Sequence, residues 1–122
     1  MHPKSLKWLN DIHQACELIL TATADRALAE YDSDRLLQSG IERNFEIIGE
    51  ALGRIRKIDP ATADCVTDCD AIIAFRNLLI HGYDFIDNSR VWQIIKADVP
   101  KLHEQVCAVL RESAENLSSG QD

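Results

Sequence analysis

The sequence has few residues that break helices, since only 5 glycines and 3 prolines occur among its 122 residues. It also lacks the strict alternation of apolar and polar side chains that marks a strand, whereas helical spacing recurs through nearly the whole chain. These features favour an all-α fold. The length suits one domain, because domains cluster near about 100–150 residues.

Other absences exclude whole classes of protein. The chain has no run of about 18 apolar residues, so we expect no membrane span. Its N-terminus is too polar for a signal peptide, and its four cysteines form no Cys-x-x-Cys pair. We therefore expect a cytoplasmic protein with reduced thiols. A helical metal protein that uses Cys65 and Cys69 is an alternative, although their three-residue spacer matches few zinc sites.

Positive charge is scarce as well. The chain has 13 Lys and Arg against 20 Asp and Glu, which leaves a formal net charge of −7. A protein that coats nucleic acid by bulk charge needs an excess of cations. The balance therefore argues against broad binding driven by charge, but it permits one local phosphate site. The basic run Arg54, Arg56 and Lys57 is a candidate source of a local positive field.

Apolar stripes predict the first two helices. One covers residues 6–22, and a longer one covers 34–58. Asp59–Pro60 ends the second, because the residue before a proline avoids helical geometry. The segment between them predicts a loop or a brief helix.

Two further helices follow. One begins near Thr67 or Asp68 and stops at Gly82, and the other covers about 91–109 with Pro100 kinking or interrupting it. We expect an antiparallel bundle of four to five helices within residues 1–112. Residues 113–122 are expected to form a flexible C-terminal tail.

The densest polar cluster in an apolar stretch lies in AIIAFRNLLIHGYD, residues 71–84. Asn77 and His81 are four residues apart and share a helix face, and Arg76 can reach the same spot from the flank. Arginine offers a charged fork to a phosphate, and histidine exchanges a proton near neutral pH. RNA supplies its own nucleophile, the 2′-hydroxyl, so this pair is suited to cleaving a phosphodiester. A buried hydrogen-bonded pair or a cap is the structural alternative.

A polar strip made of Arg43, Glu46 and Glu50 follows the second helix at steps of three and four. It either faces solvent with intrahelical ion pairs or faces the Arg76/His81 helix and orients it. Gly49 and Gly53 leave a flat helix face, which predicts close packing of another backbone. His2, His13 and His103 have no comparable polar neighbours in the sequence, and we assign them to surface or core.

Three segments, in register, resemble one known family. RNLLIHGYD, residues 76–84, resembles the R-x4-H-x-Y motif of the HEPN superfamily, in the branch of HepT-like toxins. ERNFEIIGEALGRI and IDNSRVWQIIKADVPKL resemble that branch's second and closing helices. The resemblance extends from about residue 5 to 110, and every motif position is filled.

The resemblance implies a HEPN helical bundle that forms a homodimer. It implies a metal-independent ribonuclease, the toxin of a type VII toxin–antitoxin pair, with no metal or cofactor in its site. The catalytic residues would be Arg76 and His81 of two protomers, supported by Asn77. The implied partner is an MNT-type nucleotidyltransferase antitoxin, similar to MntA, that transfers AMP onto Tyr83.

We therefore predict an endoribonuclease that leaves a 2′,3′-cyclic or 3′ phosphate on its RNA products. The alternative is a non-catalytic HEPN subunit that binds nucleotide or RNA, or that docks a nucleotidyltransferase. The net negative charge is consistent with that alternative.

Overall fold

A computed structural model describes residues 1–82 and 86–118 of the chain. Within these ranges it contains seven helices and no strand, so the predicted all-α class is confirmed. The helices are α1 (Pro3–Thr23), α2 (Leu28–Ser33), α3 (Arg35–Ile58), α4 (Pro60–Ala63), α5 (Cys69–His81), α6 (Asn88–Ala97) and α7 (Val99–Ser118). None of the described helices combines the length and the apolar character needed to cross a membrane.

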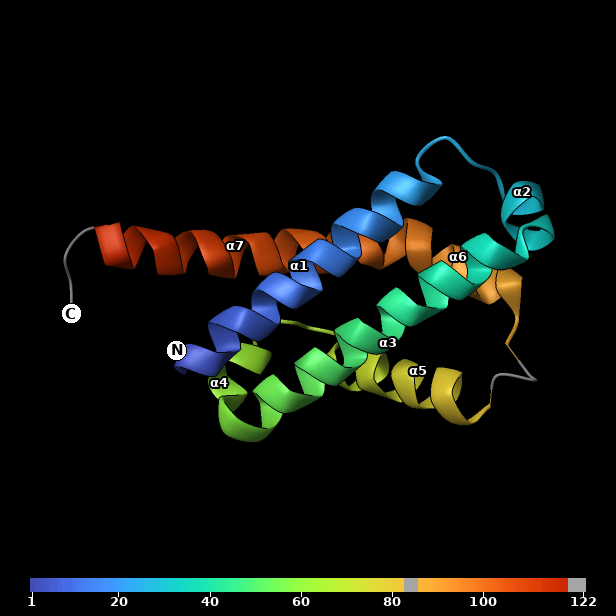
Figure 1. Cartoon of the computed structure of the whole chain (residues 1–122). Coiled ribbons are helices and arrows are strands. Elements are labelled where there is room, and N and C mark those ends of the chain that lie inside the picture. Colours follow the sequence, from blue (N-terminus) through green and yellow to red (C-terminus); the bar gives the residue numbers. More distant parts are fainter. Residues whose placement is uncertain (83–85, 119–122) are drawn as a thin grey trace.

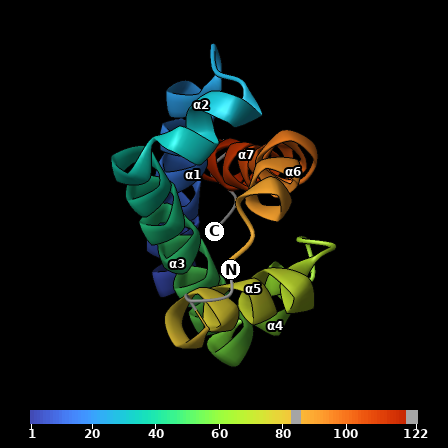
Figure 2. The ribbon, with the colours of Figure 1, turned by 90° about the vertical axis from the view of Figure 1, so that its right-hand side faces the viewer.

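The long helices pack around α1 and α3, which run side by side in opposite directions (Figure 1). α1 contacts both α3 and α7, α6 adjoins α2 and α7, and α5 packs chiefly on α3. Figure 2 shows α4 and α5 at the opposite end of the molecule from α2. The core between these helices is closed by apolar side chains: Leu9, Ile12, Ile19, Ile48, Leu52, Ile55, Ile95 and Val106 are each at most 1% exposed.

The helix boundaries follow local capping chemistry. Asp34 caps α3, because its carboxylate accepts a hydrogen bond from the Leu37 amide at 3.0 Å. Gly82 follows α5 and donates its N–H to the Leu78 carbonyl at 2.7 Å. The predicted interruption near Pro100 is confirmed, since α6 ends at Ala97 and α7 begins at Val99.

Two details differ from the expectation. Asp68 occupies the N-cap position of α5 without capping it, and its carboxylate instead pairs with Lys101 of α7 at 3.0 Å. α7 continues to Ser118, past the boundary expected at residue 112. Residues 119–122 lie outside the described residues, so the flexibility of the tail stays a prediction.

α3 and α5 approach each other closely at Gly49. A Cβ atom added to Gly49 would lie 2.2 Å from the Cβ and 2.7 Å from the Cγ of Arg76. Both distances are far below a van der Waals contact, so only glycine permits this packing. The predicted close packing is thus confirmed at Gly49. It is wrong at Gly53, where an added Cβ would meet nothing within 4 Å.

We predict that Gly49→Ala destabilises the fold by about 1–3 kcal/mol, the usual cost of overpacking. The clash is with the Cβ of Arg76, which cannot move without displacing the α5 backbone. Gly53→Ala is the matched control on the same helix, and it should be neutral or stabilising by up to about 1 kcal/mol. Urea unfolding followed by circular dichroism measures both, and equal stabilities for the two variants would contradict the assignment.

Candidate functional site

The predicted catalytic residues, Arg76 and His81, lie on α5, a helix that is apolar but poorly covered. Most of its thirteen residues are apolar, yet Leu79 is its only buried residue. Ile72, Ile73 and Phe75 are half-buried against the core, and the ring of Phe75 packs edge-on against Phe45 of α3 at 5.2 Å between centroids. The rest of the helix faces outward.

Two large apolar side chains of α5 stay exposed, Leu78 at 48% and Ile80 at 37%. They are two residues apart, so they lie about 200° apart around the helix and do not form one stripe. Leu78, with Ala71, also lines the cavity between α3, α5, α6 and α7. Leu78 and Ile80 thus lie at the two edges of an exposed face, and apolar surface of this kind suits contact with another protein.

Arg76 is half-buried where α5 crosses Gly49. Its Nε is buried and has no hydrogen-bond partner within residues 1–82 and 86–118. One terminal nitrogen, Nη1, donates a hydrogen bond to Oδ1 of Asn77 at 3.1 Å. Buried polar groups in native proteins are nearly always paired, so an unpaired Nε is unusual.

His81 is exposed in the last turn of α5, where the negative end of the helix favours a cation. Among the described residues, its ring has no hydrogen-bond or ion-pair partner. Asn77, one turn before it, contacts Arg76 rather than His81. We expected Asn77 to orient His81 or contact RNA, whereas in this structure its carbonyl oxygen holds the arginine.

The polar strip on α3 contains intrahelical ion pairs. Arg43 lies 3.9 Å from Glu46, and Glu50 lies 2.8 Å from Arg54. Where the structure is described, neither glutamate bonds to Arg76 or His81. Of the two interpretations, the structure therefore supports the ion-paired strip, and a role for these residues in orienting α5 stays a prediction.

The basic run at the end of α3 supplies little free charge. Arg54 is paired with Glu50, and Arg56 is paired with Asp70 at the start of α5. The second pair ties α5 to α3 near its first turn. Lys57 is the remaining cation of the run, so the local field at α5 depends more on Arg76 than on these three residues.

A cavity of about 330 Å³ lies between α3, α5, α6 and α7. Its lining is mainly apolar and includes Phe45, Ile72, Phe75 and Leu102. Neither Arg76 nor His81 lines it. The candidate site is therefore the open face of α5 and not this cavity.

Two expectations about metal ligands need correction. His13 and His103, which we assigned to surface or core without polar neighbours, stack on each other with their ring centroids 5.0 Å apart. Together with Cys107 they form the group of potential metal ligands found among the described residues, and Cys65 and Cys69 do not belong to it. The i, i+4 spacing of His103 and Cys107 was the available sequence signal.

Tyr83, the predicted modification site, lies outside the described residues. It follows directly after Gly82, the residue that ends α5.

Comparison with known proteins finds similarity to one family and to several proteins named as RNases. The model of a family described as "Ribonuclease HepT-like" matches residues 12–109. A Methanocaldococcus jannaschii protein named "Putative RNase" is 31% identical over 99 residues, which covers 81% of this chain and 90% of that protein. A Thermococcus cleftensis protein named "Probable ribonuclease HepT" is 30% identical over 99 residues, covering 78% and 86% of the two chains.

A third relative is longer. It is a Methanocaldococcus jannaschii protein named "Gamma-glutamylcyclotransferase and putative RNase", 28% identical over 112 residues. The match covers 92% of this chain but only 50% of that protein. No solved structure matches this chain.

Proposed function

The chain belongs to the HepT-like ribonuclease family, and from that premise we propose that it is an endoribonuclease whose site is built from Arg76 and His81 of two copies. The observation that carries this proposal is that α5 presents the half-buried Arg76, held by Asn77, and an exposed His81 with no hydrogen-bond partner among the described residues. An anionic phosphate suits the terminal nitrogens of such an arginine.

Arg76 binds the scissile phosphate and stabilises the charge that builds on it in the transition state. Asn77 holds one arm of the guanidinium through the 3.1 Å hydrogen bond, which leaves the other donors for phosphate oxygens. Pre-orientation of this kind lowers the entropy that the arginine loses when it binds substrate.

His81 moves the proton. The 2′-hydroxyl of the RNA attacks the adjacent phosphorus, the bond to the 5′-oxygen breaks, and a 2′,3′-cyclic phosphate forms. An imidazole serves both as the base for the 2′-hydroxyl proton and as the acid for the departing oxygen. One imidazole can take up the 2′-hydroxyl proton and then give a proton to the departing oxygen.

The uncovered face of α5 supports a homodimer. Leu78 and Ile80 are exposed at the two edges of a helix face that carries the exposed Ala74, Asn77 and His81. Burying this face against a second copy is favourable by roughly 25 cal/mol per Å² of apolar surface. A two-fold axis near α5 would bring the two Arg76/His81 sets together in one cleft.

A second part of the proposal concerns regulation. As a toxin, the chain would be paired with a nucleotidyltransferase antitoxin that attaches AMP to Tyr83. Tyr83 comes two residues after His81 in the sequence, and the negative charge of an attached AMP would compete with RNA for the site. The antitoxin would offer a basic surface to this acidic chain.

We predict that the purified chain cleaves RNA in EDTA and that Arg76→Ala slows cleavage by about 100–1000-fold. His81→Ala should slow it by about 100–10,000-fold, the usual contribution of acid–base catalysis. Arg111→Ala, at an exposed arginine of α7, is the matched control and should keep full activity. Gel-based cleavage rates, with circular dichroism to confirm folding, provide the measurement. Undiminished cleavage by both site variants would refute the assignment, and RNA binding without turnover would favour the non-catalytic alternative.

The shared site makes a second prediction. If Arg76 of one copy works with His81 of the other, co-purified heterodimers of Arg76→Ala and His81→Ala contain one intact set. Differently tagged variants, produced together and isolated by tandem affinity, should regain at least about a quarter of the wild-type rate. Each variant alone should stay inactive. Recovery no greater than that of the separate variants would mean that the site lies within one copy.

For Tyr83 we predict a mass increase in whole AMP units when the chain is produced together with such a nucleotidyltransferase. Tyr83→Phe should show no increase and should cleave RNA in the partner's presence. Intact-protein mass spectrometry and a cleavage assay on the same samples test both points. Protection that survives in the Tyr83→Phe variant would show that the partner acts by binding alone.

A further inference from the structure

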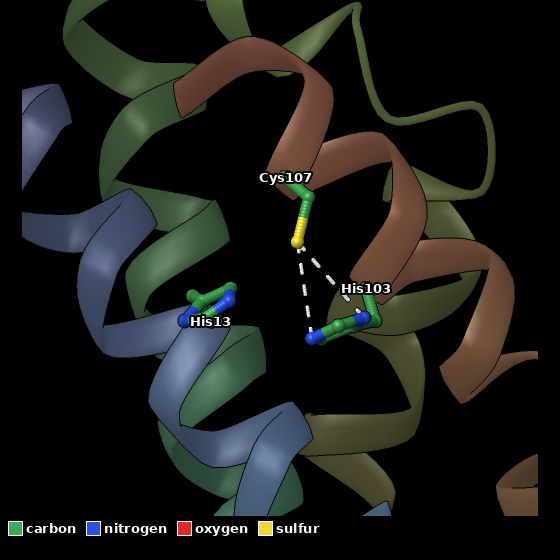
Figure 3. Close-up of side chains that lie close together, drawn as sticks. All are labelled: His13, His103 and Cys107. Atoms are coloured by element: carbon green, nitrogen blue, oxygen red, sulfur yellow. Dashed lines mark hydrogen bonds between the residues drawn. The ribbon is translucent and has the colours of Figure 1, made fainter. Parts of the chain in front are cut away.

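A second cluster of reactive side chains lies where α1 packs against α7. His13 comes from α1, and His103 and Cys107 come from consecutive turns of α7, facing it (Figure 3). All three are half-buried, and one potential ligand atom from each lies within 4.8 Å of the others. His13 lies 90 positions before His103 in the sequence, so only the packing of α1 against α7 brings the two histidines together.

The two imidazoles share a carboxylate. Oε1 of Glu17, one turn after His13 on α1, lies 3.4 Å from Nε2 of His13 and 3.2 Å from Nε2 of His103. The Cys107 sulfur lies 3.8 Å from Nε2 and 4.0 Å from Nδ1 of His103. His13, His103 and Cys107 thus form one group of potential ligands, and the Glu17 carboxylate lies beside its two imidazoles.

The ligand types select the metal. Zinc in proteins takes four ligands from thiolate, imidazole and carboxylate, at about 2.0–2.3 Å, which sets neighbouring ligand atoms roughly 3.5 Å apart. The contacts of Glu17 and Cys107 with His103 are already close to that spacing. Two imidazoles and a thiolate do not suit Mg²⁺ or Ca²⁺, which prefer oxygen.

We propose that His13, His103 and Cys107, with Glu17 as the fourth ligand, form a Zn²⁺ site that joins α1 to α7. Binding replaces the proton of the Cys107 thiol with the metal, so one proton is released from that residue. The His103 ring turns so that a nitrogen, rather than its face, meets the metal beside the sulfur.

This site is separate from the ribonuclease site. α5, which carries Arg76 and His81, packs chiefly on α3, whereas the zinc site belongs to the contact between α1 and α7. Zinc bound here would stabilise the fold, because it would hold α7 against α1. RNA cleavage in EDTA and zinc binding are therefore measured independently, and the failure of one leaves the other standing.

The test uses the full chain, stripped with EDTA and freed of chelator. Equilibrium dialysis should find one Zn²⁺ bound per chain, with a raised Tm, and Mg²⁺ should produce neither effect. His103→Ala and Cys107→Ser should each weaken zinc binding by at least about 100-fold, since even the loss of an outer-shell partner costs 10–100-fold. Cys65→Ser and His81→Gln, at residues outside the cluster, are matched controls and should keep wild-type affinity.

A spectroscopic measurement keeps the proposal testable without any variant. Co²⁺ in this site should give the visible bands of a tetrahedral ion and a near-ultraviolet thiolate-to-metal charge-transfer band. Absence of that band in the wild-type chain contradicts the proposal. So does stoichiometric zinc binding that Cys107→Ser retains, or that Cys65→Ser loses to the same extent.

Discussion

The close approach of α3 and α5 at Gly49 is the constraint on which the candidate site depends. With no Cβ at Gly49, the first side-chain atoms of Arg76 occupy the space that any other residue would fill. The arginine is therefore held half-buried at the helix crossing, with its Nε removed from solvent and one arm on Asn77. A guanidinium that packing holds in this way has lost most of its conformational freedom before any ligand binds.

The same packing leaves α5 with one covered side. It rests on α3 and is tied there by Arg56 and Asp70, while its outer face exposes Leu78 and Ile80 beside the motif. Each chain carries a net charge of −7, so two copies repel at long range. The proposed dimer therefore relies on apolar contact along α5. The same repulsion would act on RNA, so in the proposed dimer the two Arg76 side chains would supply most of the attraction for the substrate.

Much of the fold was predictable because local chemistry sets the helix boundaries. Asp34, Pro60, Gly82 and Pro100 each lie at a helix end for a reason that depends only on their neighbours in the chain. Gly49 was predictable as a close-packing residue, but Gly53 looked identical in sequence and faces open space. The spacing of the two glycines shows that one face of the helix is flat. Whether another helix covers that face is decided by the tertiary arrangement.

The site was predictable in part for the same reason. Arg76 and His81 stood out because polar residues interrupted an apolar helix, yet the bond from Arg76 to Asn77 depends on rotamers that the sequence does not display. The cluster of His13, His103 and Cys107 was missed because its halves lie on opposite ends of the chain. Contacts between residues so far apart in the sequence arise from helix packing. The only sign of this cluster in the sequence is the i, i+4 spacing of His103 and Cys107.

The most direct test of the central claim is the chemistry of the RNA ends. Attack by the 2′-hydroxyl, with Arg76 on the phosphate and His81 moving the proton, leaves a 2′,3′-cyclic or 3′ phosphate on one product and a 5′-hydroxyl on the other. Mapping the ends of a defined RNA, cleaved by the purified chain in EDTA, should give those termini. Products with a 5′-phosphate and a 3′-hydroxyl would contradict the account, because they require an external water as the nucleophile.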